Sequence, residues 1–271
     1  MNKNFYWDKK IYPKKQIVYD FAAIKFSTKQ YLIQKYLFPK KTDVFLSLGC
    51  GIGRNLLCLA PQIKKGIGID ISPRAINIAQ KAKKTLGIKN INFFCRDATE
   101  VNFKTDKIIC FDLLEHLENP QKIFNVIKKN LKKNGKALIY TNFYGKFSLE
   151  FLTEFLKRKG KLKKLWSVDF PPLHLHRFKK NQISAFCQKA GLKHKLVFKN
   201  HFFSPLLNFL THLVRTFSTK KKKESFKKQK KIFFRTKTST SNLIQYFFAR
   251  LDLALFSSLP SGGVFIILEK L

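Results

Sequence analysis

Apolar and polar positions alternate along the chain in blocks that predict strands and helices in turn. Seven short apolar runs have the length and composition of buried strands. They lie at 43–49, 65–71, 90–97, 106–114, 136–143, 192–200 and 262–270. Helical segments separate most of them, which is typical of a doubly wound, mostly parallel sheet with helices on both faces. The fold class is therefore α/β.

Helical spacing of apolar residues predicts helices between these runs, several with recognisable ends. Residues 72–87 begin with Ser72 at the N-cap and Pro73 at the first helical position, both favoured there. A helix over 119–135 should stop at Asn134 and Gly135. Further helices are predicted at 55–63, 148–166 and 179–191.

Two regions flank this alternating core. Residues 16–38 place apolar residues at helical spacing and predict one or two amphipathic helices in an extension over 1–40. The core then covers 41–200, an insert covers 201–262, and 263–271 supply the last strand. In the insert, two apolar segments predicted to be helical, 202–214 and 242–259, bracket a lysine-rich run.

A loop of three glycines follows the first core strand, in "FLSLGCGIGRN". Gly49, Gly51 and Gly53 stand at alternate positions. A dinucleotide fingerprint needs its third glycine three residues after the second, and that position is Arg54. The loop can therefore admit the amino-acid or sugar part of a ligand without a specific pyrophosphate seat. A purely structural turn is the alternative.

Two carboxylates follow the next two strands. Asp70 ends the second core strand and could accept hydrogen bonds from ribose hydroxyls, while Asp97 ends the third and could accept from an adenine amino group. Open α/β sheets bind ligands at the carboxyl ends of their strands. Either residue alone could be a cap or turn residue, but together with the loop they predict a nucleoside site.

These motifs resemble those of class I S-adenosylmethionine-dependent methyltransferases, with a Rossmann-like seven-stranded sheet. The matching stretches are "LSLGCGIGRN", "GIDIS", "FCRDATE", "CFDLLEHLENP" and "LKKNGKALIYTNFYGKFS". The segment from Cys110 to Pro120 is similar to that of ubiquinone-biosynthesis O-methyltransferases. The resemblance covers about residues 40–200 and the last strand, and it places a substrate lid near 149–180.

The resemblance implies a cofactor, S-adenosyl-L-methionine, and a set of residues that bind it. The glycines and Cys50 would contact its methionine and ribose parts, Asp70 and Ile71 the ribose, Asp97 and Ala98 the adenine, and Phe111 the methionine end. Ser47 departs from the family, which usually has Asp or Glu there. Serine can keep a hydrogen bond but loses the attraction for the cofactor's ammonium group.

Histidines are the candidates for activating the acceptor. His116 lies one turn past the fourth core strand, with Glu115 beside it as a partner or a helix cap. His174 and His176 lie two positions apart in a proline-bearing loop, where they would share one face if the loop is extended. We expect His116 and His174 to be catalytic, although each could have a packing role. The sequence offers too few identifiable ligands for a metal site.

The net charge and the cysteines indicate which partners the protein could bind and in which compartment it could work. The 271 residues carry a formal charge of +38, which favours a polyanionic partner or reflects a lysine-rich composition alone. Five scattered cysteines indicate a reducing environment, and the basic amino-terminal residues lack the apolar run of a signal peptide. We expect a cytoplasmic protein, peripheral on the inner face of the membrane if the insert binds lipid.

The expected function is methylation of a small or lipid-like acceptor, with oxygen favoured as the methylated atom. Lysines within 202–259 could bind an anionic membrane surface while the apolar segments enter the headgroup region. A core-facing helical pair with a basic loop is the alternative for the insert. An RNA methyltransferase is a second possible function, supported by charge but lacking a stacking clamp or a suitable cysteine nucleophile. A non-catalytic scaffold that retains a decayed cofactor loop is a third.

Overall fold

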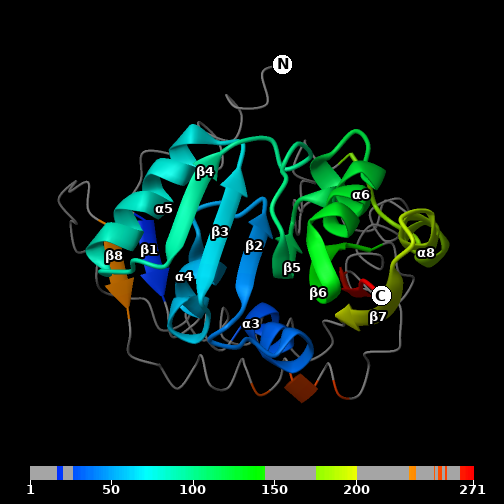
Figure 1. The fold of residues 1–271 in the computed structure, drawn as a ribbon, viewed down its shortest axis with the longest axis horizontal. Helices are drawn as coiled ribbons and strands as arrows, with labels where there is room; N and C mark the ends of the chain where they lie inside the picture. The colour runs from blue at the N-terminus through cyan, green and yellow to red at the C-terminus, as the bar shows by residue number, and fades with distance from the viewer. Residues whose placement is uncertain are drawn as a thin grey trace, which may run out of the picture.

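The computed structural model describes residues 17–20, 27–143, 175–199, 232–235 and 263–271, with four further positions, Phe247, Arg250, Leu251 and Ala254. The core of this part is a seven-stranded sheet in the order β4-β3-β2-β5-β6-β9-β7 (Figure 1). Its strands are β2 (Val44–Leu48), β3 (Lys65–Asp70), β4 (Ile91–Cys95), β5 (Thr105–Phe111), β6 (Leu131–Asn142), β7 (Lys193–Lys199) and β9 (Gly263–Glu269).

The sheet is mostly parallel, as the alternating pattern predicts. Strands β4, β3, β2, β5 and β6 pair in parallel, whereas β9 runs antiparallel to both β6 and β7. The strand order reverses between β2 and β5, because β2 leads to β3 on one side and β5 leads to β6 on the other. Open α/β sheets bind ligands outside the carboxyl ends of the strands at such a switch point.

Helices cover both faces of the sheet, as expected for a doubly wound fold (Figure 1). Apolar residues of α3 (Thr28–Leu32), the π-helical turn η2 (Ile33–Leu37), α4 (Arg54–Leu59) and α5 (Pro73–Thr85) belong to one buried cluster. Those of α6 (Gln121–Asn130) and α8 (Lys180–Lys189) belong to a second cluster on the opposite face. Short 3-10 turns, η3 (Ala60–Gln62) and η4 (Leu114–His116), follow α4 and β5.

The start of α5 confirms its predicted cap. The Ser72 side-chain oxygen accepts a hydrogen bond of 3.0 Å from the Ala75 N–H, and Pro73 is the first helical residue. This bond satisfies one of the four amide groups that a helix leaves without an internal acceptor. The second strand and its helix are thereby joined by a turn of only two residues.

Helix α6 ends earlier than the predicted stop at Asn134. The buried Asn130 side chain donates to the carbonyl oxygens of Val126 and Val101 and accepts from the Phe103 N–H. These bonds end the helix at Asn130, and the chain continues as β6 from Leu131. Asn134 does adopt a left-handed conformation, at φ 60°, but within this extended segment. The prediction of helix over 131–135 was wrong.

The amino-terminal extension is only partly helical. Residues 28–37 confirm the predicted helix, but β1 (Ile17–Asp20) is a strand that pairs in parallel with β8 (Ile232–Arg235). The prediction is wrong for 17–20, because four residues cannot distinguish the two periodicities and pairing with β8 decides the conformation. Strand β8 also places a short strand in the insert, at the end of the basic run, where no strand was predicted.

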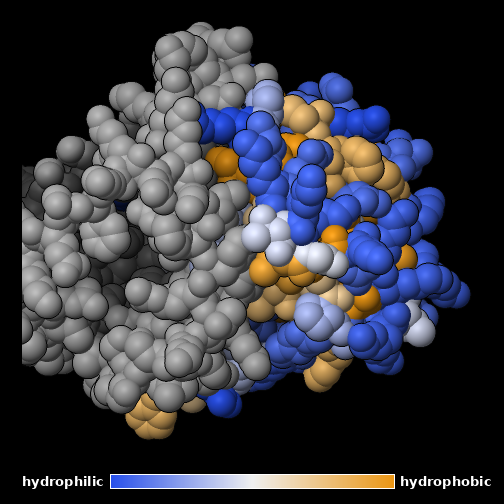
Figure 2. Space-filling view, turned by 90° about the vertical axis from the view of Figure 1, so that its left-hand side faces the viewer, coloured by the Kyte–Doolittle hydropathy of each residue, from blue (hydrophilic) through white to orange (hydrophobic). Residues whose placement is uncertain are grey.

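Other parts of the insert and the lid are only partly described. Phe247, Arg250, Leu251 and Ala254 are helical, in agreement with the helix predicted within 242–259. The lysine run at 220–231 and lid residues 149–174 lie outside the described residues. Within the described part, no helix is both long and apolar enough to cross a bilayer. Hydrophilic residues cover much of the described surface on the side of α5 and β4 (Figure 2).

Candidate active site

The glycine loop connects β2 to α4 at the switch point of the sheet. Gly49 and Gly53 have φ angles of 64° and 80°, in the left-handed region that side chains rarely adopt. A Cβ on Gly53 would lie 2.5 Å from the Phe93 ring, and one on Gly49 would lie 3.2 Å from the Leu113 side chain. Glycine at these positions lets the loop turn tightly against its neighbours.

Asp70, at the end of β3, holds this loop. One carboxylate oxygen accepts a 2.7 Å hydrogen bond from the Gly51 N–H, and the other accepts a 3.0 Å bond from the Ser72 N–H. A carboxylate has about four acceptor positions, so more than two groups can bind to it. Asp70 therefore joins the loop to α5 and lies at the strand end where the sequence predicts the ribose.

Asp97 has a more local role in the structure. Its side chain is exposed and accepts a 2.7 Å hydrogen bond from the Thr99 N–H in the turn after β4. The neighbouring Ala98 is 7% exposed. Ile71 is half-buried, and its carbonyl oxygen accepts from the Cys95 thiol. These residues line the same edge of the sheet as Asp70, so the predicted ribose and adenine residues lie on adjacent strands.

The end of β5 supplies the other wall of the switch point. Phe111 is 8% exposed, and Asp112, which follows it, adopts a left-handed conformation at φ 53°. Asp112 donates its N–H to the Tyr140 carbonyl oxygen at 3.0 Å. This bond extends the β5–β6 pairing by one residue.

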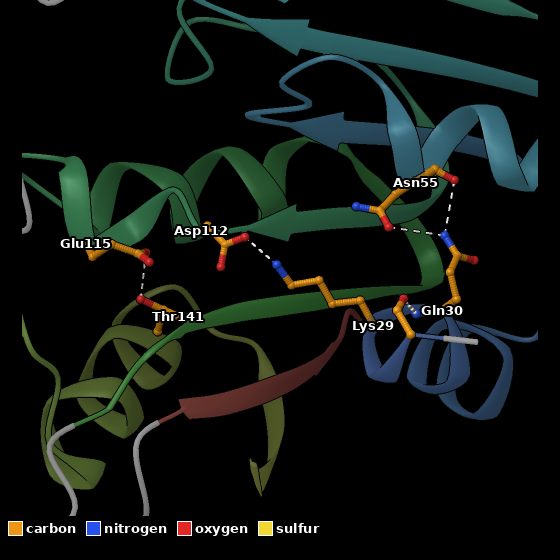
Figure 3. A network of polar contacts seen from close by, with 7 residues as sticks. Lys29, Gln30, Asn55, Asp112, Glu115 and Thr141 are labelled. Carbon is orange, nitrogen blue, oxygen red and sulfur yellow. Dashed lines mark hydrogen bonds and ion pairs between the residues drawn. The ribbon is translucent and has the colours of Figure 1, made fainter. Parts of the chain in front are cut away.

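Two side chains join helix α3 to this region, one to the end of β5 and one to α4 (Figure 3). The Lys29 ammonium donates to the Asp112 carboxylate and lies 4.9 Å from the centre of the Tyr140 ring and 5.4 Å from that of Phe111. Gln30, 3% exposed, donates to the Asn55 side-chain oxygen at 3.2 Å. The amino-terminal extension therefore contributes directly to the site.

A tyrosine of β1 contacts the glycine loop itself. The Tyr19 hydroxyl donates a 2.5 Å hydrogen bond to the Ile52 carbonyl oxygen, and the side chain is fully buried. Burial raises the pKa of this hydroxyl far above its ordinary value, so it stays protonated as a donor. Sequence reasoning missed Tyr19, Lys29 and Gln30, since nothing local marks residues whose partners are 25 to 83 positions away.

A buried carboxyl group lies beside the Lys29 pair. Glu115, 1% exposed, accepts a 2.9 Å hydrogen bond from the Thr141 hydroxyl (Figure 3). Burial raises its pKa to about 7, and the charge of Asp112 acts in the same direction. The backbone carbonyl oxygen of Glu115 also accepts two hydrogen bonds. One comes from the Leu175 N–H at 2.7 Å and the other from the His176 N–H at 3.3 Å. Glu115 thus binds the described end of the segment that is predicted to be a substrate lid.

The structure describes two of the three histidines that the sequence singles out, His116 and His176. His116 is half-buried in the turn η4, next to Glu115. The ring of His176 contacts the Leu117 carbonyl oxygen at 2.8 Å through Nε2, so the structure brings His176 to the η4 turn. His174 lies outside the described residues, and its predicted role stays a prediction.

Ser47 in β2 and Cys50 in the glycine loop are further predicted cofactor residues. Ser47 is 6% exposed and pairs in register with Gly68 and Ile109, in the middle of the sheet. Burial raises the pKa of the Cys50 thiol well above its ordinary value, with a further contribution from the Asp70 charge. Cys50 therefore stays a neutral thiol and is no candidate for a nucleophile.

The residues at the switch point fit the predicted cofactor. Gly49 and Gly53 leave no room for side chains, the Asp70 carboxylate holds the loop at the end of β3, and Phe111 is the buried last residue of β5. A comparison with known families decides the assignment, because a methyltransferase domain matches residues 39–194. The chain belongs to this methyltransferase domain family. The domain uses S-adenosylmethionine, and the match covers the loop, Asp70 and the β5 turn.

Curated relatives of this methyltransferase are similar over part of their length. An uncharacterised protein of Rickettsia prowazekii is 34% identical over 111 residues, which is 38% of this chain and 44% of the relative. A ubiquinone biosynthesis O-methyltransferase of Rickettsia conorii is 34% identical over 98 residues, 35% of this chain and 34% of the relative. The chain thus spans less than half the length of these relatives.

Solved structures share the fold of this methyltransferase. Phosphoethanolamine N-methyltransferase 2 of Haemonchus contortus, in complex with phosphomonomethylethanolamine and S-adenosylhomocysteine, has a TM-score of 0.60 at 17% identity. That match covers 100% of this chain and 60% of the other. The YcgJ protein of Bacillus subtilis has a TM-score of 0.54 at 15% identity, covering 89% and 96%. Both confirm the predicted Rossmann-like methyltransferase sheet.

Proposed function

We propose that this chain transfers a methyl group from S-adenosylmethionine to an oxygen atom of a small or lipid-like acceptor. The observation that carries the proposal is the Lys29–Asp112 ion pair, held against Phe111 and Tyr140 at the end of β5. The cofactor supplies an electrophilic methyl group on a sulfonium. The chain must align an acceptor hydroxyl with that group and favour its deprotonated form, because an oxyanion is the better nucleophile.

The ion pair favours oxygen over nitrogen as the methylated atom. An amine acceptor enters a site as an ammonium ion and is bound best by a carboxylate. The Asp112 carboxylate is already paired with Lys29, and the ammonium of Lys29 would repel a second cation. An acceptor oxyanion next to the Lys29 ammonium is stabilised instead, because opposite charges attract.

Removal of the acceptor proton is assigned to His116, with His174 as the second candidate. His116 follows Glu115 in the η4 turn and is half-buried. A histidine titrates near neutral pH, which suits a general base. The Glu115 carboxyl, whose pKa is raised to about 7 mainly by burial, lies next to it and can change charge in the same pH range.

A membrane surface is the proposed place of reaction. The lysines between 220 and 231 would contact anionic headgroups, and the apolar segments around them would enter the headgroup region. Support comes from the net charge of +38 and from relatives named for ubiquinone biosynthesis. The protein would then work in the cytoplasm, peripheral to the inner face of the membrane.

The experiment offers labelled S-adenosylmethionine and a panel of acceptors to the full chain. The panel contains polyprenylated and short phenols, phosphoethanolamine, and total RNA. We expect label in a phenol, and we expect Lys29→Met to lower kcat about 10²-fold, as loss of one oxyanion donor does. Cofactor affinity should change little. Lys122→Met, on the exposed side of α6, serves as the matched control.

Other outcomes lead to defined alternatives. Label in phosphoethanolamine, with none in the phenols, would show that the assignment to oxygen is wrong. Label in RNA would support the nucleic-acid alternative, and cofactor binding with no transfer to any acceptor would support a non-catalytic scaffold. With an acceptor known, His116→Ala or His174→Ala should lower turnover by roughly 10²–10⁴-fold if that histidine is the base.

A further inference from the structure

A second concave site lies on the face of the sheet that carries α3. It has a volume of about 330 Å³, at the lower end of the range for small-molecule sites. The lining residues come from three places: the α3–η2 helix, strand β7, and the helical positions near residue 250. They are Tyr31, Leu32, Lys35, Tyr36, Val197, Phe247, Arg250, Leu251 and Ala254. None belongs to the glycine loop or to the strand ends around Asp70 and Asp112.

The floor of this cavity is apolar and belongs to the protein core. Leu32 is 1% exposed and Val197 is 6% exposed. Val197 is in register with Phe265 of β9, which is in register with Tyr140 of β6. Residues in register share a face of the sheet, so the floor lies two strands, or roughly 10 Å, from the Tyr140 ring. The cavity is therefore a neighbour of the active site and separate from it.

The rim of the cavity is cationic and aromatic. Lys35 lies 5.9 Å from the centre of the Tyr31 ring and 5.5 Å from that of Tyr36. Arg250 lies 4.6 Å from the Tyr31 ring, and Lys195 adds a third cation 5.8 Å from the Tyr36 ring. The nine lining residues include two cations and no acid. Such a rim attracts an anion, while contact with the tyrosine rings limits the positions of the cations.

We propose that this cavity binds an anionic amphiphile, a molecule with an apolar chain and a phosphate or carboxylate head. The chain would lie against Leu32, Val197 and Leu251, and the head would lie at the rim between Lys35 and Arg250. Arginine and lysine at such a rim provide charge-assisted hydrogen bonds to a phosphate. Phe247, which is 62% exposed, adds an aromatic side chain to the lining. Binding here requires neither the methyl donor nor the acceptor.

Calorimetry with decyl phosphate, below its micellar concentration, tests the site on the full chain. We expect one molecule bound per chain, with inorganic phosphate and the uncharged amphiphile decyl maltoside at least tenfold weaker. The double variant Lys35→Gln, Arg250→Gln should lower the affinity at least tenfold, since each charged hydrogen-bond partner contributes that much. A matched control is the double variant Lys122→Gln, Lys129→Gln, which removes two exposed lysines of α6 on the opposite face of the sheet.

A variant that fills the cavity separates specific binding from general attraction. Ala254 is exposed and lines the cavity, so Ala254→Trp should block the site without disturbing the core. The proposal is overturned if Ala254→Trp binds decyl phosphate as the unaltered chain does, if the α6 control loses as much affinity as the rim variant, or if decyl maltoside binds equally well. Retained binding of S-adenosylmethionine shows that each variant is folded.

Vesicles distinguish the two sources of such a ligand. They are prepared with and without anionic phospholipid and compared with monomeric decyl phosphate. If Ala254→Trp loses both vesicle binding and decyl phosphate binding, the cavity takes a lipid from the bilayer. If it loses decyl phosphate binding alone, the cavity takes a free amphiphile. Because these measurements require no methyl transfer, failure of the proposed O-methylation would leave their outcome unaffected.

Discussion

The Tyr19 hydroxyl donates a hydrogen bond of 2.5 Å to the carbonyl oxygen of Ile52, inside the glycine loop. This bond connects the strand β1 of the amino-terminal extension to the loop at the switch point. Buried carbonyl groups are costly to leave without a donor. The extension therefore contributes to the shape of the cofactor loop, although it lies outside the region that matches the methyltransferase domain.

Tyr19→Phe should weaken both the fold and the cofactor site. The change removes the hydroxyl and leaves the ring, so the Ile52 carbonyl group loses its donor at little cost in packing. We expect the free energy of unfolding to fall by about 1–3 kcal/mol and the affinity for S-adenosylmethionine to fall several-fold. Urea unfolding and calorimetry measure the two effects. Tyr36→Phe, a hydroxyl removal on η2 away from the loop, should leave the affinity unchanged.

Asp70 should be required for cofactor binding. Asp70→Ala removes the acceptor of the Gly51 and Ser72 N–H groups together with the predicted partner of the ribose. Loss of a charged hydrogen-bond partner typically costs about 1.5–3 kcal/mol, which corresponds to a 10- to 100-fold weaker affinity for S-adenosylmethionine in calorimetry.

Asp106→Ala is the matched control for Asp70. Asp106 also accepts a hydrogen bond from a backbone N–H, that of Val44 at 2.8 Å. This bond lies at the amino ends of β2 and β5, away from the predicted cofactor site. Its replacement should lower the free energy of unfolding and leave cofactor affinity intact. Unchanged affinity in Asp70→Ala would refute the assignment of the ribose site.

Ser47→Asp tests the position at which this chain departs from the family. Ser47 is 6% exposed, so an aspartate there would be buried, at a cost to the cofactor-free protein. The ammonium group of S-adenosylmethionine would offset that cost. We therefore expect a lower melting temperature without cofactor and a larger stabilisation when cofactor is added. Ser47→Asn, which adds the same volume without charge, is the control, and a large loss of affinity in Ser47→Asp would place the loop differently from the prediction.

The parts of this structure that the sequence predicts are those with local causes. The glycine loop, the Ser72 cap and the apolar runs each depend on neighbouring residues, so β2 to α5 follow from the pattern. Helix α6 ends at Asn130 instead, because that side chain finds partners at Val101 and Phe103. Likewise, the β1–β8 pair joins residues more than two hundred positions apart, and no periodicity reports such a pairing.

The candidate site also contains residues that the sequence predicts and residues that it does not. Gly49, Gly53, Asp70 and Phe111 could be predicted because motifs after consecutive strands meet at one edge of a parallel sheet. Lys29 and Gln30 could not be predicted, since a lysine and a glutamine on an amphipathic helix usually face solvent. Only the packing of α3 on the same face of the sheet as α4 brings them to Asp112 and Asn55.

Glu115 should make the stability of the protein depend on pH. Burial raises its pKa from about 4.5 to about 7, so the folded state binds a proton more tightly than the unfolded state does. The contribution of Glu115 to the free energy of unfolding is therefore fully present below about pH 4.5. This contribution is lost as the pH rises to about 7 and beyond. The shift corresponds to a loss of roughly 3 kcal/mol over this range.

Glu115→Gln should remove that loss, because glutamine has similar shape and carries no titrating group. Urea unfolding of both proteins at intervals from pH 4.5 to pH 8 gives the difference in free energy of unfolding, in which contributions from other titrating groups cancel. We expect Glu115→Gln to gain stability relative to the unaltered chain as the pH rises. In Thr141→Val the carboxylate loses its 2.9 Å donor, so the pKa of Glu115 should rise further and the loss should extend to higher pH. A difference that is constant across the range would mean that Glu115 is ionised in the folded protein throughout, held by the Lys29 ammonium despite its burial.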